Sequence, residues 1–130
     1  MIKETVMLVL GRKVIAKLMI EHMRNVTHKE VFGVYEFNKV KNMALAHRPV
    51  FALVEIPERY GDPALDTLDV CGDIKEASPN CNIVLLCPEQ DKKSVDICIE
   101  AKITGKIEDY IFYEASLEYL TSKVKTLLPA

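Results

Sequence analysis

A single carboxylate, Glu55, ends the most apolar stretch in the middle of the chain. The preceding residues, Val50–Val54, form a continuous apolar run that is opened by Pro49 and shows no period-2 alternation. A short run of this kind is typical of a strand covered on both faces, in the middle of a parallel sheet flanked by helices. Because sites in open α/β sheets form beyond the carboxyl ends of the strands, we expect Glu55 at the functional edge.

A basic segment, Gly11-Arg12-Lys13, lies between the apolar run Thr5–Leu10 and an expected helix. Helix N-termini attract anions, so one alternative is a flavodoxin-like regulatory domain that binds a nucleotide or another small phosphorylated ligand. Against it, the sequence has neither a GxxxxGK[ST] loop nor a GxGxxG fingerprint, and Glu55 would repel an anion nearby. An enzyme is not predicted, because no base and nucleophile converge.

The four cysteines, Cys71, Cys81, Cys87 and Cys98, show no CxxC pair and no metal-ligand spacing. Free thiols in a chain whose start carries no secretory signal indicate a reducing cytoplasm. Small core hydrophobes are their expected role, and no metal site is predicted. Cys87 has a second interpretation as a reactive thiol, since it precedes a helix that begins at the functional edge.

Length and composition are those of one globular domain. The chain has 130 residues, of which 49% are hydrophobic and 28% are charged, and this length is sufficient to bury a core. The net charge of −2 gives no electrostatic case for direct nucleic-acid binding, which normally requires a basic patch. No apolar run approaches the ~20 residues of a membrane span. We therefore expect a single domain over residues 1–130 that binds neither nucleic acid nor membrane.

Strand and helix signals alternate from one end of the chain to the other. Strands are predicted over Thr5–Leu10, Glu30–Glu36, Val50–Val54, Asn82–Cys87 and Tyr110–Tyr113. Strict alternation specifies a parallel sheet with helices on both faces, because crossover connections are right-handed. The predicted fold is a flavodoxin-like three-layer α/β/α sandwich whose five-stranded parallel sheet has the order 2-1-3-4-5.

The five helices are predicted from apolar residues at three- and four-residue spacing. Their inward faces are expected to comprise Val14, Ile15, Leu18, Met19, His22 and Met23 in the first helix; Val40, Met43 and Ala44 in the second; Leu65, Leu68, Cys71 and Ile74 in the third; Val95, Cys98, Ile99 and Ile103 in the fourth; and Leu117, Leu120, Val124, Leu127 and Leu128 in the fifth. The expected N-caps of the last four helices are Asn38, Asp62, Asp91 and Ser116.

Four local segments carry a resemblance to a known family. They are Val54–Pro57 at the end of the third strand, Ile83–Asp91 around the end of the fourth, Ala101–Tyr113 leading into and through the fifth, and Ser116–Leu120 opening the last helix. With five β/α units in this length, the whole chain resembles the receiver domain of bacterial two-component response regulators. In that family an aspartate at the end of the third strand accepts a phosphoryl group from a histidine kinase. Two acidic residues hold Mg²⁺ beside it, and a Ser or Thr and a Lys complete the pocket.

Every one of these working positions is changed in this chain. The acidic pair falls on Gly11 and Arg12, the phosphoacceptor on Glu55, the hydroxyl on Cys87 and the lysine on Tyr113. Arg12 would place a fixed positive charge where Mg²⁺, which requires oxygen ligands, would sit. Glu55 is one methylene longer than aspartate and so displaces the nucleophile from in-line geometry. We therefore expect no phosphotransfer and no bound Mg²⁺ or other cofactor.

The resemblance thus implies a degenerate pseudo-receiver, which signals through protein–protein contacts without phosphorylation. Two alternatives remain for its pocket: Arg12 pairs with Glu55 and holds one fixed state, or Arg12 points into solvent and Glu55 caps a loop. Tyr110 matches the family's switching aromatic, although simple packing on the sheet also accounts for it. The expected partner surface, including that of a homodimer, is the face formed by the fourth helix, the fifth strand and the fifth helix.

Overall fold

One parallel sheet organises the chain. The computed structural model describes residues 4–113 and 117–128, with strands β1 (Thr5–Val9), β2 (Glu30–Val34), β3 (Phe51–Glu55), β4 (Asn82–Cys87) and β5 (Asp109–Phe112). All neighbouring strands pair in parallel, in the order β2-β1-β3-β4-β5. The predicted topology is therefore confirmed, with the first and third strands side by side at the centre.

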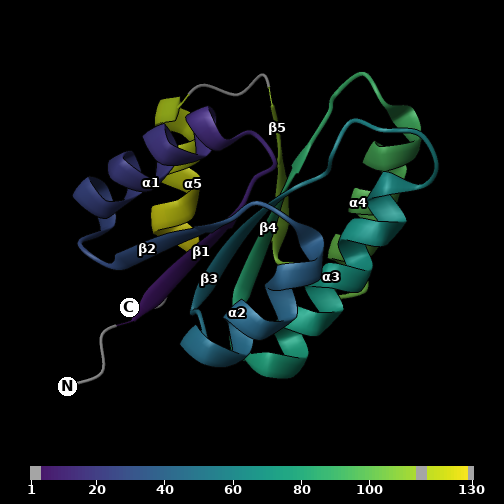
Figure 1. The fold of residues 1–130 in the computed structure, drawn as a ribbon. Helices are drawn as coiled ribbons and strands as arrows, with labels where there is room; N and C mark the ends of the chain where they lie inside the picture. The colour runs from purple at the N-terminus through teal and green to yellow at the C-terminus, as the bar shows by residue number, and fades with distance from the viewer. Residues whose placement is uncertain (1–3, 114–116, 129–130) are drawn as a thin grey trace.

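Helices cover both faces of this sheet, as the prediction requires. They are α1 (Lys13–Thr27), α2 (Val40–His47), α3 (Pro63–Ala77), α4 (Lys92–Ile103) and α5 (Leu117–Leu127), and the short 3-10 helix η1 (Phe37–Lys39) precedes α2. Figure 1 shows α1 and α5 together on one side of the sheet, and α2, α3 and α4 on the other. In the described part of the chain, no helix combines the length and the apolar character that a membrane crossing needs.

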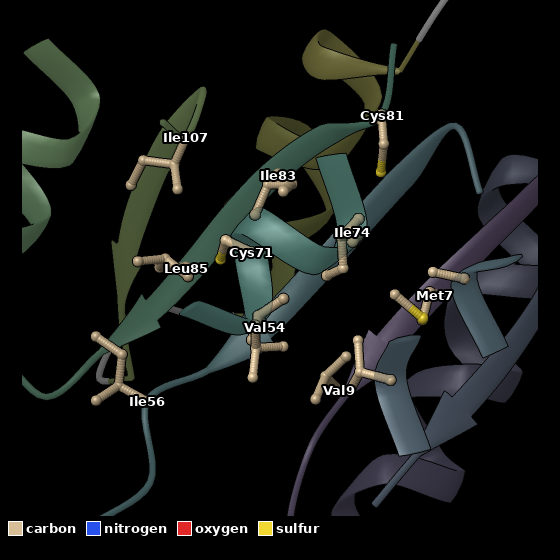
Figure 2. Close-up of a cluster of buried hydrophobic side chains, with 14 of the residues drawn as sticks. Met7, Val9, Val54, Ile56, Cys71, Ile74, Cys81, Ile83, Leu85 and Ile107 are labelled. Atoms are coloured by element: carbon tan, nitrogen blue, oxygen red, sulfur yellow. The ribbon is translucent and has the colours of Figure 1, made fainter. Parts of the chain in front are cut away.

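Each face of the sheet has its own hydrophobic core, which is why the central strands lack alternation. In β3, Ala52 and Val54 point toward α2, α3 and α4, whereas Phe51 and Leu53 point toward α1 and α5. Every residue of β3 is buried. The cluster under α2–α4 is drawn in Figure 2, where Val54, Leu85 and Ile74 come from three different elements. A strand that is buried on both faces gains apolar burial from every residue.

The buried face of α1 agrees with the predicted one at Met19 and Met23 and differs from it elsewhere. Val14 and Leu18 are 76% and 65% exposed, whereas the buried residues are Ala16, Met19, Ile20 and Met23. Apolar residues occupy two adjacent faces of this helix, so their spacing alone does not determine which face packs on the sheet. Ala16, which has the smallest side chain on either face, allows the helix to approach the strands closely.

Two other helices show the same kind of difference. Leu65 in α3 and Ile99 and Ile103 in α4, all predicted to face inward, are 47%, 40% and 80% exposed. Small residues take their place against the sheet: Ala64, Thr67 and Val70 in α3, and Ser94 and Ala101 in α4. The polar members are satisfied locally, since the Thr67 hydroxyl donates to the Pro63 carbonyl at 2.6 Å. The longer side chains of Leu65, Ile99 and Ile103 are turned outward instead.

Of the predicted N-caps, only Asp91 acts as one among the described residues. Its carboxylate accepts the backbone N–H of Ser94 at 3.4 Å and the Ser94 hydroxyl at 2.8 Å. Asp62 occupies the N-cap position of α3, but its side chain makes no capping bond to the described backbone and pairs with Lys93 instead. Asn38 lies inside η1, so the prediction that it caps α2 was wrong. Ser116 lies outside the described residues.

Candidate functional site

The carboxyl ends of β1, β3, β4 and β5 meet at one edge of the sheet. Gly11 and Arg12 follow β1, Glu55 ends β3, and Tyr113 follows β5. The structure brings the Gly11 backbone and the side chains of Arg12, Glu55 and Tyr113 into contact. Cys87 ends β4 at the same edge, but its side chain is buried in the core under α2–α4. The topology thus brings all five positions to one edge of the sheet, and contacts link four of them there.

Glu55 is held by two partners from the loop after β1. Its Oε1 accepts the backbone N–H of Gly11 at 3.3 Å, and its Oε2 lies 3.6 Å from a guanidinium nitrogen of Arg12. Glu55 is 9% exposed, so its carboxylate is largely removed from water. A charge in that position is stable only when it is paired and hydrogen-bonded. The contact corresponds to the first alternative for Arg12, that of an ion pair with Glu55.

Tyr113 closes the pocket from the β5 side. Its hydroxyl donates to the carbonyl of Ile56 at 2.6 Å, and the Arg12 guanidinium lies 5.8 Å from the centre of its ring. Burial, followed by the nearby charge of Glu55, raises the pKa of Tyr113 above that of a free phenol. The group therefore remains a neutral donor, and it contributes no positive charge to the pocket. The sequence placed Tyr113 here but did not predict its bond to Ile56.

The donor set of this pocket does not suit Mg²⁺. Oε1 of Glu55 accepts the Gly11 N–H, and the Arg12 guanidinium lies 3.6 Å from Oε2, so a positive charge already neighbours the carboxylate. Mg²⁺ requires near-octahedral oxygen ligands and commonly one or two carboxylates. No group of three or more His, Cys, Asp or Glu side chains with metal-binding geometry occurs among the residues that the structure describes.

The cysteines are buried thiols, as expected for core residues. All four are free and buried, and burial is the main cause that raises the pKa of Cys71 and of Cys81 to about 12. For Cys98, a hydrogen bond with Cys87, followed by burial, also raises the pKa. The thiolate is the reactive form, so these environments disfavour reaction.

Tyr110 packs on the sheet rather than standing free of it. It is half-buried against the core under α2–α4, and its ring meets that of Phe112 edge-on, with centroids 5.8 Å apart. Close by, Tyr119 in α5 is 52% exposed. These aromatic side chains belong to the face formed by α4, β5 and α5. This is the face that the resemblance to receiver domains predicts as a partner surface.

A buried carboxylate ties that face together. Asp109, at the start of β5, is 8% exposed and lies 3.0 Å from Lys102 of α4 and 2.8 Å from Lys123 of α5. Burial alone raises the pKa of Asp109, but hydrogen bonds from Lys123, Lys102 and the Tyr110 N–H outweigh it, so the pKa lies below its ordinary value. Neither lysine contact was predicted, because each joins residues from two different elements.

We expect Asp109→Asn to reduce the free energy of unfolding by about 1–3 kcal/mol at neutral pH, since hydrogen bonds to a charged group are lost. A carboxylate whose folded pKa is lowered stabilises the protein above its unfolded pKa of about 3.9, and this stabilisation is lost as pH falls below that value. The difference between Asp109→Asn and the parent should therefore shrink below about pH 4. Urea unfolding across pH measures it; a difference that is independent of pH would contradict the assigned ion pairs.

Comparison with known proteins identifies the fold. No protein-family model matches the sequence, and no curated protein sequence does. Among solved structures, the N-terminal domain of the nisin resistance regulator NsrR, a lantibiotic response regulator, is similar with a TM-score of 0.76 and 18% identity, over 97% of this chain and 98% of that one. A two-component response regulator from Clostridium difficile is similar with a TM-score of 0.73 and 17% identity, over 96% and 95% of the two chains.

A third similar structure, an adenylate cyclase from Rhodopirellula baltica, has a TM-score of 0.72 and 17% identity, over 96% of this chain and 87% of that one. The chain therefore has the flavodoxin-like fold of response regulator receiver domains, as the sequence predicted. At these identities the likeness shows the fold alone.

Proposed function

We propose that this chain is a receiver-like signal-transduction domain with a degenerate phosphorylation pocket, which acts through protein–protein contacts and has no enzymatic activity. The observation that carries the proposal is the pairing of Arg12 with Glu55. The guanidinium supplies a permanent positive charge beside the carboxylate at the end of β3. A phosphorylatable receiver acquires positive charge there from a metal ion, so in this chain a fixed side chain replaces a reversible ligand.

Two further features of the pocket support this function. The Gly11 N–H donates to Oε1 of Glu55 and the Arg12 guanidinium lies beside Oε2, so each oxygen has a neighbour that holds it away from in-line attack on phosphorus. Tyr113 supplies a neutral hydroxyl that is already bonded to Ile56, so transition-state charge on a phosphoryl group would have no lysine to stabilise it. Each change removes a different requirement of phosphotransfer.

Intact-mass spectrometry after incubation with acetyl phosphate and Mg²⁺ tests the proposal. We expect no phosphoryl adduct on this chain under conditions that phosphorylate an active receiver treated in parallel. A stoichiometric adduct that is lost in Glu55→Gln would overturn it. An adduct that persists in Glu55→Gln would place the modification elsewhere and would leave the assignment of the pocket intact.

The partner surface proposed is the face formed by α4, β5 and α5, with a second copy of the chain as the partner. Its support is the exposed ring of Tyr119, which is 52% accessible at the edge of a depression next to Tyr110 and Phe112. Sedimentation equilibrium should detect a dimer that Tyr119→Asp weakens and Leu45→Asp, on the exposed side of α2, does not. A chain that is monomeric at high concentration would exclude the homodimer.

A further inference from the structure

A cavity of about 530 Å³ opens between α1, α5 and the carboxyl edge of the sheet. Its floor consists of Leu10, Leu86 and Ile111, and its walls of Ile15 and Met19 from α1 and Leu120 from α5. Figure 1 shows these two helices side by side over one face of the sheet. The volume lies within the range of roughly 300–1,000 Å³ that is typical of small-molecule sites.

Residual exposure of core residues gathers around this cavity. Met19, Leu86 and Leu120 are 9%, 7% and 6% exposed, whereas Leu8, Phe51 and Leu53 in the same core are 0–1% exposed. Ile15, at the rim, is 43% exposed. Apolar surface is left open where the two helices meet the sheet. A ligand that covers this surface gains free energy from its burial.

The polar groups at the mouth define the chemistry of such a ligand. Arg12, Glu55 and Glu58 line the opening together with Tyr113. The mouth carries both signs of charge, so a charged head group of either sign meets a like charge there: a carboxylate or phosphate meets Glu55 and Glu58, and an amine meets Arg12. Arg12 carries five N–H donors, yet its only polar contact among the described side chains is the one to Glu55. An uncharged acceptor, such as a carbonyl oxygen, can therefore bind at Arg12 without displacing Glu55.

We propose that this cavity binds an uncharged amphiphile, with an aliphatic body against Ile15, Met19 and Leu120 and a neutral carbonyl oxygen that accepts from Arg12. The inference goes beyond the proposed function and stands separately from it, because it requires neither the presence nor the absence of phosphotransfer. The ligand would bind to Arg12, which also pairs with Glu55. Binding of a small molecule would thereby be coupled to the Arg12–Glu55 pair.

Three probes of equal chain length test the site: octanone, octanoate and octylamine, titrated into the whole chain and followed by amide NMR shifts. We expect saturable binding of octanone, with shifts centred on α1 and α5. Octanoate and octylamine should bind at least about tenfold more weakly, because the charged head group of each probe meets a like charge at the mouth. Absence of saturable octanone binding, or tighter binding of octanoate or octylamine, would overturn the proposal.

Variants distinguish this cavity from other apolar surface. Ile15→Trp fills the rim from a half-exposed position and should weaken octanone binding by at least about tenfold. Ile103→Trp places the same ring on exposed α4 and should leave binding unchanged. Arg12→Met keeps an apolar stem but removes the donors, and a loss of about fivefold is expected for one hydrogen bond. Unchanged binding in Ile15→Trp would show that octanone binds elsewhere.

Discussion

The four native thiols are expected to react with a water-soluble disulfide reagent at least about a thousandfold more slowly than the same thiols in the urea-unfolded chain. All four are buried, so the reagent reaches them only when the structure opens. The raised pKa of Cys71, Cys81 and Cys98 reduces the reactive thiolate further. Absorbance of the released thiol, with and without urea, measures the ratio.

An introduced thiol provides the matched control. Ile103→Cys adds a cysteine at a position that is 80% exposed on α4, and it should react at the rate of the unfolded chain. If one native thiol reacts equally fast, and that reaction disappears in Cys87→Ala, then Cys87 is an accessible and reactive group. That outcome would restore the redox interpretation of Cys87.

Leu53→Ala should lower the free energy of unfolding by about 2–5 kcal/mol. Leu53 lies in the central strand and is 0% exposed, so the substitution removes buried methyl groups and leaves a cavity in a region that cannot easily collapse. A loss of this size is a large fraction of the stability of a typical domain, which is about 5–15 kcal/mol. Urea denaturation followed by circular dichroism measures the loss.

Leu18→Ala is the matched control, because the same substitution is made at a position that is 65% exposed on α1. It should change the free energy of unfolding by no more than about 0.5 kcal/mol. A loss comparable to that of Leu53→Ala would show that α1 packs with Leu18 inward. In that case the spacing of Val14 and Leu18 would have predicted the buried face correctly.

These two leucines show how far the fold could be predicted. Leu53 belongs to a short apolar run that is opened by Pro49 and lacks alternation, which indicates a strand buried on both faces. The topology follows from the alternation of strand and helix signals. Leu18 belongs to a helix with apolar residues on two faces. Which face is buried depends on how closely the helix approaches the sheet, and small residues such as Ala16 and Ala101 decide that. The spacing of large apolar residues predicts a helix, but it does not show where these small residues will pack.

For the site, the sequence likewise predicts the positions of the residues but not their contacts. Strand order alone brings Gly11, Glu55 and Tyr113 to one edge, so their proximity follows from topology. Their contacts do not follow from it: the bond from Tyr113 to Ile56 and the orientation of Arg12 depend on side-chain reach and on the path of the loops. The pairing of Arg12 with Glu55 was one of two alternatives, and nothing in the order of the residues favours either of them.

The central claim is that the Arg12 guanidinium takes the place of the metal ion beside Glu55. The most direct measurement is an amide NMR titration of the chain with Mg²⁺, followed by beryllofluoride, a mimic of the phosphoryl group. We predict no saturable shift at Gly11, Glu55 or Tyr113 at millimolar Mg²⁺, and none after beryllofluoride is added. Saturable shifts at these residues that require both additions would contradict the claim.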